Sequence, residues 1–145
     1  MALSKYQKIS LAITLFIAVM IFYVSSLTFA PGKPGLNFKA ILYHVTVFFF
    51  LSSFLFLSSI KRKNFRLIPI AVTVLILYAI SDELHQFFVP GRAFTLEDIF
   101  IDTVGITFAL MIYSIRILLV KKSRSKSKNT KPLVKTSNLS EFSSN

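Results

Sequence analysis

The chain has 145 residues, of which 54% are hydrophobic and sixteen are phenylalanine. Its mean hydropathy of +0.66 excludes a small soluble domain, which could not bury so much apolar surface. Cysteine is absent, which excludes disulfides, thiolate nucleophiles and cysteine-ligated metal sites. The net charge of +11 does not indicate nucleic-acid binding, because the basic residues flank apolar segments and no nucleic-acid-binding module is recognisable.

Four predominantly apolar segments follow one another along the chain, and each can cross a bilayer as a helix of about 20 residues, the third only if it continues beyond its apolar run. They predict an all-α fold: an integral membrane four-helix bundle over residues 1–120. A basic Ser/Lys-rich tail, residues 121–145, follows and is predicted to be disordered. The predicted spans are about residues 9–29, 38–60, 67–88 and 96–120.

The first segment is either a signal peptide or a retained helix. Leu27-Thr-Phe-Ala30 loosely resembles a small-residue cleavage site. The apolar run is, however, longer than the roughly 7–15 residues usual in a signal peptide, and Pro31 would directly follow the cut. We therefore expect a retained helix, which ends at the turn Pro31-Gly-Lys-Pro-Gly35.

Lysine and arginine residues predict the orientation of the bundle. With four spans, the N-terminus, residues 61–66 and the tail share one side and carry most of these cations, whereas the opposite loops carry only Lys33, Lys39 and Arg92. The positive-inside rule then places both termini in the cytoplasm. The tail is either an orientation signal only or also a tether to anionic lipids.

The most informative stretch is residues 81–105, which holds five of the six acidic residues. The apolar run before it, residues 67–80, is too short to cross a bilayer of about 30 Å. The third helix must therefore continue to about Phe88 and carry ionisable groups into the outer part of the membrane, where such groups usually face other protein. Thr95-Leu-Glu-Asp98 then predicts a helix start, with threonine as the N-cap.

Helix geometry places three ionisable groups from three helices at one level. At about 1.5 Å per residue, His44, Asp82 and Asp102 each lie about 7–9 Å inside the outer boundary. Tyr78, Asp82, His85, Gln86 and Val89 share one helix face, and Asp98, Asp102, Gly105 and Ala109 share another. Gly105 and Ala109 have the small-xxx-small spacing that lets membrane helices approach closely.

These patterns predict an outward-facing polar pocket floored by His44, Asp82 and Asp102. Residues Glu83, Asp98 and Arg92 are placed at its mouth, lined by Phe87, Phe88 and Phe94. The full predicted set for the functional pocket is Lys39, His44, Asp82, Glu83, Gln86, Arg92, Asp98, Asp102 and Gly105. No catalytic residue is assigned within it.

Individual members of this set also have purely structural explanations. In this alternative, Asp82 and Glu83 of the third segment would pair with Lys39 and Arg92 as buried ions. Asp98 would interact only with the dipole at the N-terminus of the fourth helix, and His44 would only form a hydrogen bond between helices. His85 is expected at the interface without a specific role.

The spacing Asp82-Glu83-x-x-Gln86, then Pro90-x-Arg92, then Asp98-x-x-x-Asp102-x-x-Gly105 resembles the VanZ-like family. In this family Asn is common where Asp102 stands, which keeps a metal or proton role for Asp102 open, and a second Gly is common where Ala109 stands. The resemblance implies a multi-pass protein of the bacterial inner membrane. It also implies a link to resistance against the glycopeptide teicoplanin, with which the founding member is associated.

Three functions are compatible with this set of residues. The first is a cell-envelope accessory, without a resident cofactor, that binds a lipid-linked cell-wall component or another anionic ligand. The second is a membrane-embedded enzyme acting on a lipid phosphate or ester, with a divalent cation held by Asp82, Glu83, Asp98 and Asp102. The third is an ion-coupled transporter, which the few polar residues of the cytoplasmic half disfavour. We expect the first, with the enzyme as the alternative.

Overall fold

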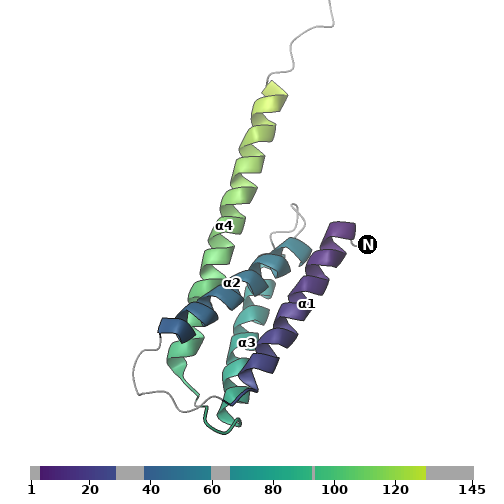
Figure 1. Ribbon diagram of the computed structural model, residues 1–145. Helices are drawn as coiled ribbons and strands as arrows, with labels where there is room; N and C mark the ends of the chain where they lie inside the picture. The colour runs from purple at the N-terminus through teal and green to yellow at the C-terminus, as the bar shows by residue number, and fades with distance from the viewer. Residues whose placement is uncertain (1–3, 29–37, 60–65, 93, 130–145) are drawn as a thin grey trace, which may run out of the picture. The chain divides into compact units, whose positions relative to one another are not determined.

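The computed structural model of the protein describes residues 4–28, 38–59, 66–92 and 94–129. Within these ranges the chain forms helices and no strand, and every helix contains a stretch long and apolar enough to cross a membrane. The predicted all-α fold with four spanning helices is therefore confirmed. The helices are α1 (Lys5–Ser25), α2 (Phe38–Ser59), α3 (Leu67–Phe87) and α4 (Leu96–Asn129) (Figure 1).

Three helix ends differ by several residues from those that hydropathy predicts, one of them the end of α1, which lies at Ser25 instead of about residue 29. Helix α1 begins at Lys5, before the apolar run, because Ser4 and Gln7 form a capping box in which each side chain bonds the other residue's backbone N–H. Helix α4 continues through residues 121–129 of the basic tail, where lysine and arginine are good helix formers and extending an existing helix needs no new nucleus. Residues 130–145 and the turn at residues 31–35 lie outside the described residues.

The chain divides into two units within α4, after Tyr113. In the first unit, hydrogen bonds fix the direction of each helix. Gln7 Nε2 donates to the carbonyl of Ser58 (3.0 Å), which joins the start of α1 to the end of α2. Tyr78 Oη donates to the carbonyl of Ala18 (2.6 Å), and His85 Nε2 near the end of α3 lies 2.9 Å from Ser26 Oγ at the end of α1, so α3 runs parallel to α1. The ends of α1 and α3 and the starts of α2 and α4 therefore lie together.

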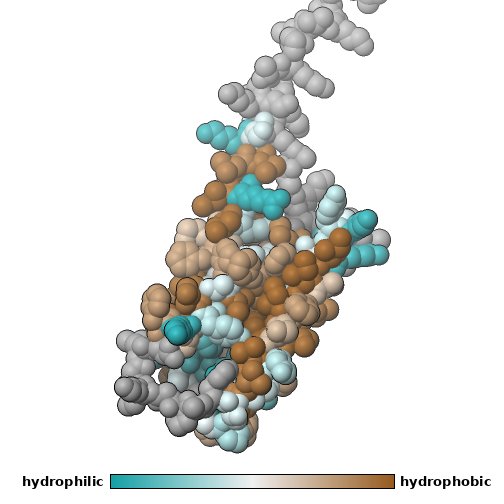
Figure 2. Space-filling view, viewed as in Figure 1, coloured by the Kyte–Doolittle hydropathy of each residue, from teal (hydrophilic) through white to brown (hydrophobic). Residues whose placement is uncertain are grey.

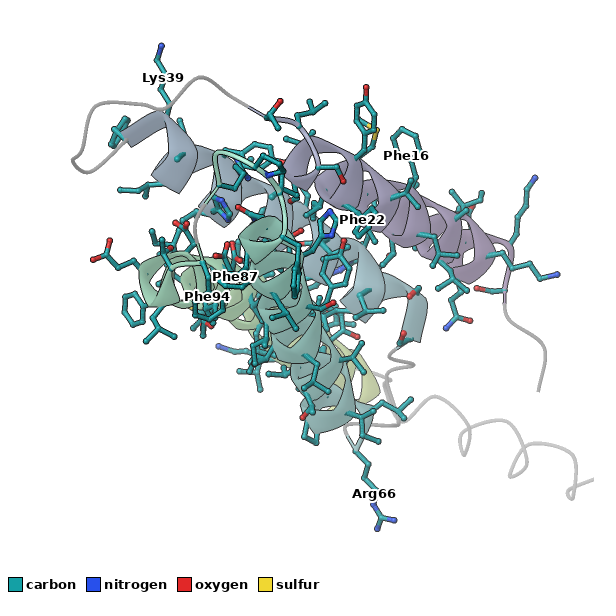
Figure 3. All side chains as sticks on the ribbon, turned by 90° about the horizontal axis from the view of Figure 1, so that it is seen from below. Phe16, Phe22, Lys39, Arg66, Phe87 and Phe94 are labelled. Atoms are coloured by element: carbon teal, nitrogen blue, oxygen red, sulfur yellow. The ribbon has the colours of Figure 1, made fainter. Side chains whose placement is uncertain are left out.

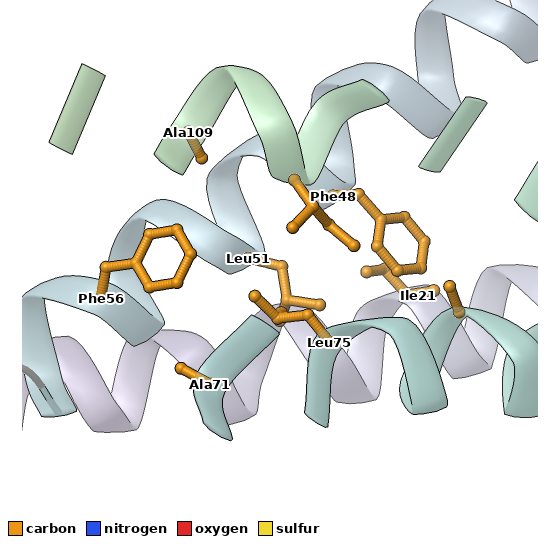
Figure 4. Close-up of a cluster of buried hydrophobic side chains, with 9 residues drawn as sticks. Ile21, Phe48, Leu51, Phe56, Ala71, Leu75 and Ala109 are labelled. Carbon is orange, nitrogen blue, oxygen red and sulfur yellow. The ribbon is translucent and has the colours of Figure 1, made fainter. Parts of the chain in front are cut away.

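The apolar core of this unit is small. Buried residues of all four helices contribute to it, among them Ile21, Phe48, Leu75 and Ala109 (Figure 4). Most other apolar side chains are exposed, and hydrophobic residues cover much of the described surface shown in Figure 2. A soluble monomer rarely exposes so large an apolar area, whereas a lipid bilayer solvates it.

Gly105 sets the distance between α2 and α4. A Cβ atom at this position would lie 2.5 Å from the carbonyl oxygen of Val45 and 3.1 Å from the backbone nitrogen of Phe49. Both are backbone atoms, so neither can rotate away. The close approach places Asp102, one turn earlier on the same face of α4, against α2.

Candidate functional site

Buried polar side chains gather at the end of the first unit where α3 ends and α4 begins. In a bundle with so small an apolar core, they form an unusual concentration of charge, because ionisable groups are costly in a membrane-embedded helix. Exposed fractions of these residues are 0–5%: His44 of α2, Asp82, Glu83 and Gln86 of α3, and Asp102 of α4.

His44 and Asp102 join α2 to α4. The His44 Nδ1 atom lies 2.9 Å from Asp102 Oδ1, and both side chains are buried. An ionised carboxylate only accepts hydrogen bonds, so the proton of this contact belongs to Nδ1; in the neutral imidazole Nε2 is then the ring nitrogen with a lone pair. The sequence analysis places His44, Asp82 and Asp102 at one level, and this contact joins two of the three.

Glu83 joins the end of α3 to the start of α4. Its Oε2 atom accepts the backbone N–H of Thr95 (3.1 Å). The Thr95 hydroxyl in turn donates to Asp98 Oδ2 (2.6 Å) and accepts the backbone N–H of Asp98 (3.2 Å). Thr95 is therefore the predicted N-cap of α4, and Glu83 takes the role that an acid on α4 itself has in a capping box. Glu83 is fully buried, whereas the sequence analysis places it at the pocket mouth.

Asp82 and Gln86 lie on the same face of α3, as predicted. Gln86 Nε2 donates to Asp82 Oδ2 (2.9 Å). Asp82 is also within electrostatic range of Asp102. Among the described residues, no hydrogen-bond partner is found for three buried carboxylate oxygens: Asp82 Oδ1, Glu83 Oε1 and Asp102 Oδ2.

Arg92 enters the site through a tight turn. The Arg92 N–H donates to the carbonyl of Val89 (3.1 Å), with Pro90 and Gly91 between them. Gly91 has φ of 82°, which favours glycine and, with the preceding proline, fits a type II turn. The half-buried Arg92 lines a hollow of about 570 Å³ together with Leu84, Phe87 and Phe94. Phe87 and Phe94 lie beside each other in Figure 3.

A comparison with family models shows where this arrangement of residues belongs. The VanZ/LLP1 model matches residues 4–119, which include α1, α2, α3 and the apolar part of α4. The chain belongs to the VanZ-like family. It is accordingly a multi-pass membrane protein, with its apolar helices in a lipid bilayer. Comparisons with curated proteins and with solved structures find no match.

The structure brings most of the residues predicted for the functional pocket together. Every residue of the predicted set lies in or beside the cluster except Lys39, which is exposed at the start of α2 and points away from the helices in Figure 3. Gly105 contributes through the helix crossing, since it has no side chain with which to bind a ligand. Phe88, predicted to line the mouth, is exposed and is not part of the hollow.

Two contacts of this VanZ-like protein are missed by the sequence analysis. His85, expected to have no specific role, stacks on Phe22 with ring centroids 4.2 Å apart, and its Nε2 lies 2.9 Å from Ser26 Oγ. It therefore attaches the end of α3 to the end of α1. Thr95 was predicted only as a cap, and its N–H bond to Glu83 depends on how the α3–α4 turn folds.

Proposed function

We propose that this VanZ-like protein is a cell-envelope accessory of the bacterial inner membrane that binds an anionic, lipid-linked ligand at its outer face. The observation that carries the proposal is the hollow formed by Leu84, Phe87, Arg92 and Phe94. Apolar walls suit a lipid chain or the lipid portion of a glycopeptide drug. A guanidinium suits the phosphate or carboxylate attached to it, because its planar fork donates two parallel hydrogen bonds.

The position of the hollow supports a lipid ligand over a freely soluble one. Leu84, Phe87 and Phe94 are each exposed, so the hollow opens on the surface that the bilayer covers. Arg92 lies in the turn that follows α3, which ends at Phe87, where the headgroup region of a membrane would begin. An amphipathic ligand can therefore enter from the membrane with its anionic group already at the level of the arginine. Capture of such a molecule would alter access to the cell surface, which is our proposed route to glycopeptide resistance.

Loss of the arginine charge should weaken this binding. The Arg92→Gln variant is expected to bind undecaprenyl diphosphate at least about tenfold more weakly than the wild type, because a hydrogen bond to a charged group contributes about 1.5–3 kcal/mol. Binding would be measured by fluorescence competition on the full chain in nanodiscs, with teicoplanin as a second probe.

Arg66 provides the matched control. It is an exposed arginine at the start of α3, at the opposite end of that helix from Arg92 (Figure 3). Arg66→Gln should leave the affinity unchanged. Equal losses in the two variants would show only a general charge effect, and wild-type protein that binds neither probe would contradict the proposal.

The proposed outward orientation can be tested because the chain has no cysteine of its own. A single cysteine at Phe88, exposed at the end of α3, should react with a membrane-impermeant maleimide added to intact cells. A cysteine at Lys5, exposed at the start of α1, should react only after the cells are opened. The reverse labelling pattern would mean that the topology is the opposite of the proposed one and that the hollow lies at the cytoplasmic face.

A metal-dependent enzyme acting on a lipid phosphate or ester is the second candidate. The contact between His44 and Asp102 favours it, because a carboxylate that holds one ring nitrogen leaves the other available as a general base or metal ligand. Turnover of a lipid phosphate by the purified chain, dependent on a divalent cation and lost in His44→Gln, would replace the accessory role with this one.

A further inference from the structure

We infer that His44, Glu83 and Asp98 form a binding site for a divalent first-row transition metal ion, with Asp102 positioning His44. One ligand atom from each of the three side chains lies within 4.8 Å of the other two. Atoms bound to a tetrahedral zinc at about 2.1 Å lie about 3.4 Å from one another. The separations would therefore have to shorten from at most 4.8 Å to about 3.4 Å for the three residues to close on an ion.

Each of the three side chains has one atom left for the ion. The contact of His44 Nδ1 with Asp102 leaves Nε2, the usual form in which a carboxylate orients a metal-binding histidine. The Thr95 N–H occupies Glu83 Oε2 and leaves Oε1, which is buried and has no hydrogen-bond partner among the described residues. Thr95 Oγ1 occupies Asp98 Oδ2 and leaves Oδ1.

Burial and charge make an ion at this place favourable. Glu83 is 0% exposed, and an uncompensated carboxylate at such a position is costly. Asp98 and Asp102 both act on it electrostatically and add negative charge. A divalent cation would neutralise Glu83 and Asp98 together and would satisfy Glu83 Oε1. A proton shared between carboxyl groups is the competing way to neutralise the cluster, and it needs no metal.

The ligand types select the kind of metal. One imidazole nitrogen with two carboxylate oxygens suits zinc or manganese better than magnesium, which prefers oxygen ligands alone. Three protein ligands leave a coordination position open, as in sites where the metal also binds an external group. This set differs from the all-oxygen set predicted from the sequence, since His44 joins it and Asp102 acts through His44. Asp82 instead pairs with Gln86.

The test uses cations alone and so does not depend on the proposed lipid ligand. Full-length protein in nanodiscs, treated with EDTA and desalted, would be titrated with Zn²⁺, Mn²⁺ and Mg²⁺. Metal content would be measured by mass spectrometry, and thermal unfolding would be followed in parallel. We expect about one Zn²⁺ or Mn²⁺ per chain with a rise in unfolding temperature, and weaker binding of Mg²⁺.

His85 provides the matched control because it is the other histidine and contacts α1 instead of the cluster. His44→Gln and Glu83→Gln should lose the bound metal, and His85→Gln should keep it. Asp102→Asn should retain the ligands but bind metal about 10–100-fold more weakly. Asp98→Asn should also lose the metal, and its amide oxygen can still accept the Thr95 hydroxyl, so this variant is a safeguard in case the other variants misfold.

Two results would overturn the inference. Wild-type protein that neither retains Zn²⁺ or Mn²⁺ nor gains thermal stability from them would leave proton sharing as the way the cluster is neutralised. Equal metal binding by His44→Gln and His85→Gln would place the ion elsewhere. Neither result bears on whether Arg92 binds an anionic lipid, so the two proposals fail separately.

Discussion

Gly105→Ala is expected to destabilise the protein by about 1–3 kcal/mol or more, the usual cost of overpacking a well-packed contact. The added Cβ would lie 2.5 Å from the carbonyl oxygen of Val45, so α2 and α4 would have to separate. The sign of the change is informative, because alanine at an unconstrained helix position stabilises relative to glycine by about 0.8–1 kcal/mol. Thermal unfolding of the full chain in nanodiscs would measure the effect.

Thr107→Ala on the same helix is the control for this result. Thr107 is exposed, and its hydroxyl bonds only to the carbonyl of Thr103 in its own helix. We expect a change within about 0.5 kcal/mol, as for most surface substitutions. A Gly105→Ala variant as stable as Thr107→Ala, or more stable than the wild type, would show that α2 and α4 do not approach as closely as the structure has them.

Asp102→Ala should cost about 3–5 kcal/mol, because removal of one partner from a buried ionic or hydrogen-bonded pair leaves the other buried and unsatisfied. The remaining His44 would have no acceptor for Nδ1. Unfolding would be measured in the presence of EDTA, so that any bound cation contributes nothing to the difference between variants.

A double-mutant cycle identifies the cause of this loss. The double variant His44→Leu with Asp102→Leu should be much less destabilised than the sum of the two single leucine variants, because both polar groups are then gone and apolar side chains fill the site. Additive effects would mean that His44 and Asp102 contribute independently and that the 2.9 Å contact does not hold α2 to α4.

Much of the site was predictable because two simple regularities governed it. A rise of about 1.5 Å per residue placed His44 and Asp102 at the same depth, and the structure joins them. The 3.6-residue period placed Asp82 with Gln86 and Asp102 with Gly105 on shared faces, and the structure buries both pairs. Such arguments need only one helix at a time.

Glu83 shows where these arguments stop. Helix periodicity puts it one position from Asp82 and so toward a different direction, and the sequence analysis places it at the pocket mouth. The structure instead buries it, because the turn through Pro90 and Gly91 brings the Thr95 N–H over its carboxylate. The candidate metal ligands changed for the same reason: His44 is included and Asp102 is not, because the choice depends on which side-chain atoms already form hydrogen bonds with neighbouring helices.

The sequence by itself determined that the chain is a membrane protein with four spanning helices and that five of its six acidic residues lie within residues 81–105. Hydropathy, spacing and the VanZ-like motif are properties of the sequence itself, so they can be recognised without knowing the tertiary structure. Only the tertiary structure decided which carboxylate oxygens are occupied, which are left open, and how closely α2 approaches α4. Those outcomes depend on hydrogen bonds between residues up to 60 positions apart, and such contacts form only once the helices have packed.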